Sequence, residues 1–178
     1  MILSVLICTI QGRETLFSRL LQLLNNQAHP DVEILFEKDN KEITTGEKRN
    51  ILLERASGEY CCFVDDDDLV CPNYVSRILD AVQTRPDCVG FTGQISFAKQ
   101  GIQRDFIHSL QYSTWFTRDN VYYRCPNHLN PVRTELARAV GYKPITVSED
   151  SDFSNRLFPL LKTCVDIPKP HLYFYLTG

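Results

Sequence analysis

The chain has 178 residues, which predicts one domain at roughly 150 residues per domain. Apolar residues make up 43% and charged residues 23%, values of a globular protein that exclude intrinsic disorder. With 19 Lys and Arg against 22 Asp and Glu, the net charge is −3, so we expect no nucleic-acid partner. No apolar run approaches the ~20 residues of a membrane-spanning helix.

The N-terminal segment and the cysteines bear on location. Residues 1–10 are apolar but lack a basic leading region, so we interpret them as a buried strand rather than a signal peptide. The seven cysteines are odd in number, contain no C-x-x-C pair and lie mostly in apolar surroundings. This favours reduced thiols over a disulfide scaffold, and therefore a cytoplasmic protein.

The first half of the chain alternates strand-like and helix-like segments. Strands are expected at residues 2–9, 32–36 and 60–64, with helices at 13–26, 44–56 and from Pro72 onward. Short β-α-β connections imply a parallel sheet with right-handed crossovers. Ligands of such sheets bind beyond the carboxyl ends of the strands. Residues 9–14, 38–40 and 65–68 all fall at those ends.

The second half is less regular. We expect a strand at 88–97, an aromatic-rich strand or loop region at 103–124, helices at 134–140 and from 149, and strands at 163–167 and 172–176.

Capping residues predict where several helices begin and end. Thr44 and Glu47 have the spacing of a capping box, and Gly58 stands where a C-cap glycine belongs. Ser148 is expected to cap the helix that begins near residue 149. Pro159 should end that helix near residue 158.

Four consecutive aspartates, residues 65–68, follow the third predicted strand. Like charges this close repel one another, so they need compensation. Mg²⁺ or Mn²⁺ would supply it, because these ions take one or two carboxylates plus substrate phosphates. A solvated acidic turn with one helix-capping aspartate is the alternative. An EF-hand is excluded, because Val70 and Ser76 stand where that loop needs Gly and Glu.

Two further segments have a functional and a structural interpretation. Glu149 and Asp150 could simply stabilise a helix start, or one could be a general base. Lys48 and Arg49 could meet a diphosphate at a helix N-terminus or lie on a solvated helix face. The Cys125–His128 segment has a zinc-like spacing but no second ligand pair. The chain contains neither a Walker P-loop nor a G-x-G-x-x-G fingerprint.

Four motifs in order resemble those of family 2 glycosyltransferases, which are inverting enzymes of the GT-A fold. They are the opening strand at 4–9, the segment 49–69 that ends in the D-x-D aspartates, the E-D motif with its helix at 149–157, and the aromatic strand at 170–175. The resemblance is weak from about residue 98 to 127. It implies a single Rossmann-like α/β domain over 1–178, with a central mostly parallel sheet flanked by helices. A nucleotide-binding part at about 1–97 would precede a smaller acceptor-side part at about 98–178.

The resemblance also implies an activity and a set of residue roles. The activity is the metal-dependent transfer of a sugar from a nucleotide-diphosphate sugar to a hydroxyl of a carbohydrate or glycoconjugate, of the hexosyltransferase type. The resemblance to the family implies a UDP-sugar as the donor. The implied roles are Thr9 and Asp39 at the nucleotide base, Arg49 at the base or diphosphate, Asp65 near the ribose, Asp67 on Mn²⁺ or Mg²⁺, and Asp150 as general base. Glu149, His128, His171 and Trp115 are further candidates for acceptor-side or auxiliary roles.

The chain departs from the family pattern at Lys38, where relatives often carry an acidic residue, which leaves Asp39 alone for the base contact. His171 could instead be structural, and Trp115 could belong to a core aromatic cluster. Two other functions remain open. One is a sugar-phosphate nucleotidyltransferase, although its glycine-rich phosphate loop is missing. The other is a non-catalytic nucleotide-sugar or glycan-binding module.

Overall fold

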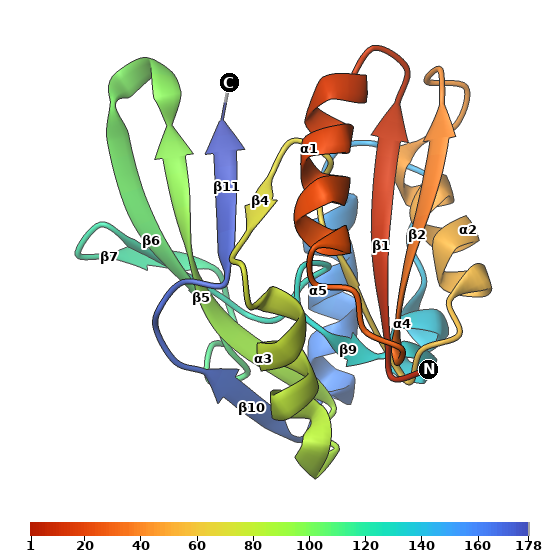
Figure 1. The fold of residues 1–178 in the computed structure, drawn as a ribbon. Helices are drawn as coiled ribbons and strands as arrows, with labels where there is room; N and C mark the ends of the chain where they lie inside the picture. Colours follow the sequence, from red (N-terminus) through yellow and green to blue (C-terminus); the bar gives the residue numbers. More distant parts are fainter. Residues whose placement is uncertain (178) are drawn as a thin grey trace.

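The computed structural model describes residues 1–177, whose strands form one 11-stranded sheet (Figure 1). Its first part consists of β2 (Val32–Asp39), β1 (Leu3–Ile10) and β3 (Tyr60–Phe63), which are adjacent and parallel, as the β-α-β pattern predicts. The β1–β2 register runs from Leu3–Val32 to Ile10–Asp39. The carboxyl ends of these two strands therefore meet at one edge of the sheet.

The second part of the sheet is mixed. β9 (Val132–Arg133) lies antiparallel between β3 and β5 (Cys88–Phe97), and the sheet continues through β6 (Ile102–His108), β8 (Val121–Arg124) and β7 (Phe116–Arg118). β10 (Cys164–Ile167) and β11 (Tyr173–Thr177) pair parallel with β5, and β4 (Leu69–Val70) pairs antiparallel with β11. β4 and β9 were not predicted, because two residues are too few for a detectable alternation.

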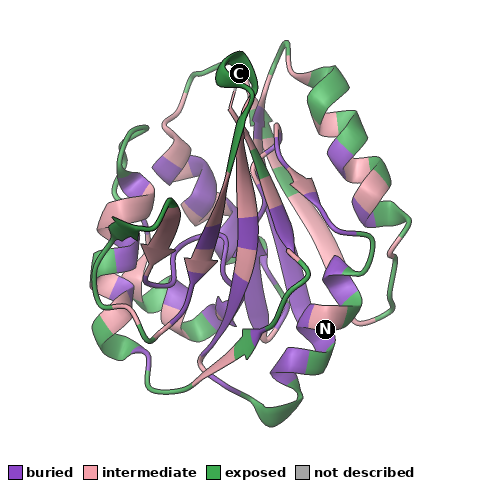
Figure 2. Ribbon diagram, turned by 90° about the vertical axis from the view of Figure 1, so that its left-hand side faces the viewer, coloured by how far each residue is buried: buried purple, intermediate pink, exposed green. Residues whose placement is uncertain are grey.

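Helices cover both faces of the sheet and divide the core in two (Figures 1 and 2). They are α1 (Glu14–Asn25), α2 (Thr45–Arg55), α3 (Tyr74–Ala81), α4 (Thr134–Val140) and α5 (Glu149–Leu157), with 3-10 turns at Val82–Thr84, Ala98–Gln100 and Phe158–Leu160. Residues of α1 and α3 share one core cluster, and residues of α2, α4 and α5 share the other. β1 contributes Leu3, Val5 and Ile7 to the first and Leu6 to the second, which explains its continuous apolar sequence.

Helix ends follow the predictions in part. Thr44 and Glu47 form the expected capping box of α2, and α5 ends at Leu157 just before Pro159. The prediction for Gly58 was wrong. A Cβ there would lie 2.6 Å from the Ser4 nitrogen, so the residue serves close approach to β1. The prediction for Ser148 was also wrong, because its backbone is left-handed and its side chain makes no capping bond.

Two general properties of the described chain complete the fold. All seven cysteines are free thiols, and five of them are buried. Across residues 1–177, no helix has both the length and the apolar character that crossing a bilayer would require.

Candidate active site

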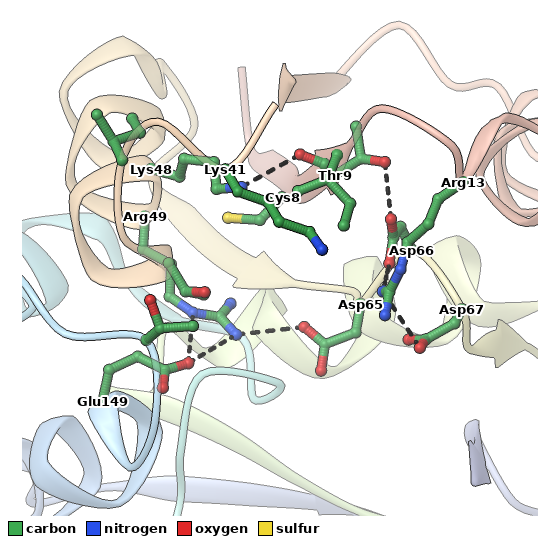
Figure 3. Close-up of a pocket in the computed structure, with 14 residues that line it drawn as sticks. Cys8, Thr9, Arg13, Lys41, Lys48, Arg49, Asp65, Asp66, Asp67 and Glu149 are labelled. Atoms are coloured by element: carbon green, nitrogen blue, oxygen red, sulfur yellow. Dashed lines mark hydrogen bonds and ion pairs between the residues drawn. The ribbon is translucent and has the colours of Figure 1, made fainter. Parts of the chain in front are cut away.

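The carboxyl ends of β1 and β3 and the starts of α2 and α5 surround a cavity of about 400 Å³, which we call the first cavity. Figure 3 shows the side chains that line it. Among them are Thr9, Arg13, Lys48, Arg49, Asp65, Asp66, Asp67 and Glu149. The sheet edge predicted to bind a ligand therefore carries a cavity large enough for a small molecule.

Asp66 and Asp67 share one cation, Arg13. Buried Asp66 accepts hydrogen bonds from the Thr9 hydroxyl at 2.7 Å and from Arg13 Nη1 at 2.6 Å. Arg13 Nη1 also lies 3.3 Å from Asp67 Oδ2. Partial burial raises the pKa of Asp67. The charge of Arg13 lowers this pKa and the charge of Asp66 raises it, and the net shift is upward. Arg13 was not predicted by name, although it lies in the 9–14 segment singled out by its position after β1.

Asp65 is held by two other side chains. Its carboxylate lies 3.2 Å from Arg49 Nη2 and 3.4 Å from His128 Nε2. Arg49 also lies 3.4 Å from Glu149 Oε1, so one guanidinium joins the two carboxylates (Figure 3). Burial alone would raise the pKa of Asp65, but the His128 and Arg49 contacts outweigh it and hold that pKa well below its usual range. The guanidinium stacks 4.6 Å above the ring of Phe63.

Replacing Arg49 with Ala should destabilise the fold by about 3–5 kcal/mol. The Arg49 side chain is 4% exposed and its removal leaves the carboxylates of Asp65 and Glu149 without their shared cation. Chemical denaturation measures the free energy of unfolding. The control is Arg55→Ala, at the other end of α2. This variant breaks the ion pair of Arg55 with Glu37 of β2 at the surface and should change the free energy of unfolding by less than about 1 kcal/mol. Equal losses in the two variants would contradict a structural role for the Arg49 bridge.

Asp68 is buried and turned away from the first cavity. Its carboxyl accepts hydrogen bonds from the Tyr173 hydroxyl at 2.6 Å and the Leu176 nitrogen at 2.9 Å, which join the aspartate run to β11. Burial, reinforced by the nearby charge of Asp65, raises the pKa of Asp68 to about 8. The four aspartates are thus held in three ways: Asp65 by Arg49 and His128, Asp66 and Asp67 by Arg13, and Asp68 by hydrogen bonds from β11.

The raised pKa of Asp68 gives a pH-dependent stability. Between the unfolded value of about 3.9 and the folded value of about 8, the folded state holds a proton that the unfolded state releases. Folding stability should therefore fall as pH rises through this window, by at most about 1.4 kcal/mol per pH unit. We expect wild type to lose stability relative to Asp68→Asn between pH 5 and pH 8, measured by urea denaturation in EDTA. If the difference in unfolding free energy between wild type and Asp68→Asn did not change with pH, the raised pKa of Asp68 would be contradicted.

Asp39, predicted to contact the nucleotide base, forms a largely buried ion pair with Lys48. Its Oδ1 lies 2.6 Å from Lys48 Nζ, which also donates to the Thr9 carbonyl at 3.3 Å. Lys48 lines the first cavity, whereas Asp39 is not among the residues that line it. Lys38 pairs with Glu14 at 2.7 Å. The structure therefore places Asp39 as the partner of a cavity-lining lysine.

Asp150 faces a different space. It lines a second cavity of about 380 Å³, together with His128, Trp115, Tyr122, Arg124 and Tyr175. The consecutive residues Glu149 and Asp150 thus border the first and second cavities respectively. His128 borders the second cavity and contacts Asp65, which borders the first. The two cavities are adjacent at the start of α5.

His171 is not brought to either cavity. Its Nε2 lies 3.1 Å from Asp105 Oδ1, and its Nδ1 lies 3.3 Å from Thr92 Oγ1. The other three further candidates are brought there: Glu149 lines the first cavity, and His128 and Trp115 line the second. Arg124, which also lines the second cavity, was not singled out from the sequence, because no sequence motif marks it.

Metal binding by protein groups alone has little support in the geometry. Within residues 1–177 no group of three or more His, Cys, Asp and Glu side chains is arranged to hold a metal ion. Asp67 is the most exposed carboxylate of the run at the first cavity, with a side chain 37% exposed against 28% for Asp65. One such carboxylate fits Mg²⁺ or Mn²⁺ when substrate phosphates supply further ligands.

The sequence itself carries a family signature across this site. The model of the family "Glycosyl transferase family 2" matches residues 45–139, just over half of the chain. The chain belongs to the family 2 glycosyl transferases. The matched segment runs from the start of α2 into α4, and it includes Arg49, His128 and the four aspartates. No curated protein sequence matches this glycosyl transferase significantly.

Solved structures share the fold of this glycosyl transferase. S. aureus TarS residues 1–349 in complex with UDP-GlcNAc superposes with a TM-score of 0.77 at 17% identity, covering 100% of this chain and 59% of that one. The UDP complex of the same TarS fragment has a TM-score of 0.75 at 17% identity, covering 100% and 61%. The mannosyltransferase PcManGT from Pyrobaculum calidifontis, in complex with GDP-Man and Mn²⁺, has a TM-score of 0.62 at 12% identity, covering 98% and 56%.

These similarities confirm the predicted GT-A fold, an α/β architecture whose central, mostly parallel sheet is flanked by helices. The chain spans about three fifths of the length of the TarS 1–349 and PcManGT chains.

Proposed function

We propose that this glycosyl transferase moves a sugar from a nucleotide-diphosphate sugar, a UDP-sugar, to a carbohydrate hydroxyl with inversion at the anomeric carbon. The observation that carries the proposal is the start of α5, where Glu149 borders the first cavity and Asp150 the second. A donor in the first cavity and an acceptor in the second would meet beside the carboxylates of Glu149 and Asp150. The ligands bound in the structural neighbours, UDP-GlcNAc, UDP and GDP-Man, support a nucleotide-sugar donor.

Two cations at the first cavity, Lys41 and Arg13, support the binding of a diphosphate. Lys41 lines it and has no carboxylate partner among residues 1–177, so it can meet a diphosphate charge. Arg13 lies opposite, beside Asp66 and Asp67. Arg49 is engaged by Asp65 and Glu149, so its role in the proposal is to orient these carboxylates rather than to bind phosphate.

Asp67 would hold the Mn²⁺ or Mg²⁺ ion together with the donor diphosphate, because it is the most exposed carboxylate of the run at this cavity. When bound, the ion supplies positive charge that stabilises the departing nucleoside diphosphate.

Asp150 would act as the general base. Its carboxylate accepts the proton of the acceptor hydroxyl as the hydroxyl oxygen forms a bond to the anomeric carbon of the donor. The bond between that carbon and the diphosphate oxygen breaks, and the nucleoside diphosphate leaves with the electron pair. Attack from the face opposite the leaving group inverts the configuration.

Ligand-dependent thermal stabilisation tests the donor class. We expect UDP and a UDP-sugar to raise the melting temperature more than GDP, AMP or free sugar, and to do so more strongly with Mn²⁺ than with EDTA. Product analysis then separates the alternatives. A glycosyltransferase releases nucleoside diphosphate, a nucleotidyltransferase releases pyrophosphate, and a binding module releases neither. Stabilisation independent of the nucleotide would contradict the proposal.

A further inference from the structure

The second cavity carries an arginine between two aromatic rings. Tyr122 and Arg124 are two residues apart on β8, so their side chains lie on the same face of the strand. The Arg124 guanidinium carbon is 4.9 Å from the centre of the Trp115 ring and 5.0 Å from that of Tyr122. All three residues line the cavity that also contains Asp150.

Arg124 is not neutralised within the described chain. Its Nη1 donates to the Phe116 carbonyl at 3.1 Å and to the Tyr123 carbonyl at 2.9 Å, which anchors the β7–β8 hairpin. No carboxylate of residues 1–177 lies within 4 Å of its guanidinium, and its Nε and Nη2 make no hydrogen bond with those residues. This contrasts with buried Arg49, which two carboxylates neutralise.

Two unused donors on one planar guanidinium form a fork that matches the two oxygens of a carboxylate or phosphate. Arg124 is half-buried, and burial lowers the pKa of its guanidinium. An anion at this point would pair with the guanidinium. Tyr122 is fixed beside it, because its hydroxyl accepts a hydrogen bond from Arg104 Nη1 at 3.1 Å.

The same cavity presents aromatic surface to a ligand. Trp115 is 38% exposed and Tyr175 is 39% exposed, although both line the cavity. Aromatic faces with a few placed polar groups are typical of ligand pockets, and the volume of about 380 Å³ suits a small molecule. Such a surface can pack against the apolar face of a sugar ring.

We propose that the second cavity is the acceptor subsite and that it selects a saccharide carrying a carboxylate or phosphate, with the sugar ring on Trp115 and the anion on Arg124. The inference rests on the proposed function, because an acceptor subsite presupposes transfer. It adds the class of acceptor: an anionic saccharide unit rather than a neutral one.

Trp115 provides the test, because it is the only tryptophan of the chain and its fluorescence reports on this cavity without donor or turnover. The full chain is titrated with glucuronate, glucose 6-phosphate and glucose. We expect the two charged sugars to change the emission with at least tenfold tighter apparent affinity than glucose, and added salt to weaken them. Comparison of the two charged arms shows whether the subsite prefers carboxylate or phosphate.

Two variants assign the anion contact to Arg124. Arg124→Gln should lower the affinity for the charged sugars at least tenfold and leave glucose unchanged. Arg118→Gln is the matched control, since Arg118 lies on β7 of the same hairpin, over Tyr123 at 5.6 Å, and does not line the cavity. If loss of the carbonyl contacts unfolds Arg124→Gln, as near-ultraviolet circular dichroism would show, Arg124→Lys keeps the charge and removes the fork. That variant should bind the charged sugars several-fold more weakly than wild type.

Three outcomes would overturn the inference: equal affinity for glucose and the charged sugars, wild-type behaviour of the folded Arg124 variant, or an unchanged Trp115 emission with all three sugars. None depends on the first cavity. Failure of the donor assignment would appear separately, as an absence of stabilisation by UDP-sugars.

Discussion

The Asp150→Asn variant is expected to lose sugar transfer by about 10²–10⁴-fold while binding donor normally. Asparagine keeps the size of the side chain but cannot take the proton of the acceptor hydroxyl. Asp150 borders the second cavity and not the first, so the donor contacts remain in place. Steady-state transfer assays give the rate, and thermal stabilisation by UDP-sugar gives donor binding.

Asp152→Asn is the matched control for the base. Asp152 lies in the same first turn of α5, but its carboxylate is taken up by Lys143 and by Arg156 Nη2 at 2.6 Å. Its loss should weaken the fold slightly and leave transfer within a few-fold of wild type. Transfer near the wild-type rate in Asp150→Asn would exclude Asp150 as the base, and Glu149 would be the next carboxylate to test.

Asp67→Ala should abolish metal-dependent donor turnover and leave the fold intact. The side chain is partly exposed and contacts Arg13 alone among the cations of residues 1–177, so little packing is lost. Removing the carboxylate takes away the protein ligand proposed for the ion, and the remaining carboxylates of the run are engaged elsewhere. Turnover and UDP-dependent thermal shift, each with Mn²⁺ and with EDTA, provide the measurement.

Asp68→Asn distinguishes the metal contact from a general effect of substitution within the aspartate run. Asp68 is adjacent in sequence but bonds to β11 and does not line the first cavity. This variant should retain the difference between Mn²⁺ and EDTA, whereas Asp67→Ala should lose it. If Asp67→Ala kept its metal-dependent turnover undiminished, Asp67 would be excluded as the metal ligand.

The sequence predicted most of the elements because their signals are local. Continuous apolar runs indicated β1 and β3, and the Thr44–Glu47 spacing marked the start of α2. The two-residue strands β4 and β9 carry no such signal, since their backbone pairing depends on strands far away in the chain.

The candidate site was predictable in its location but not in its contacts. Position after a parallel strand indicated that Thr9 and the aspartates would gather at one edge, and the first cavity is there. Neighbouring residues in the sequence did not indicate which cation would pair with each carboxylate. Arg13 reaches Asp66 across 53 residues and Arg49 reaches Glu149 across 100.

The amino-acid order by itself determined the fold class, the family and the edge of the sheet that carries the first cavity. Strand periodicity and helix capping are properties of neighbouring residues, and the order of the motifs can be read along the chain without knowing how it folds. Only the tertiary structure decided that Glu149 and Asp150 border different cavities, that Asp39 pairs with Lys48, and that Arg124 lies beside Trp115 and Tyr122 with no carboxylate partner among residues 1–177. These are relations between segments brought together by the sheet. Their geometry follows from how β8, α5 and the aspartate run pack rather than from any local pattern.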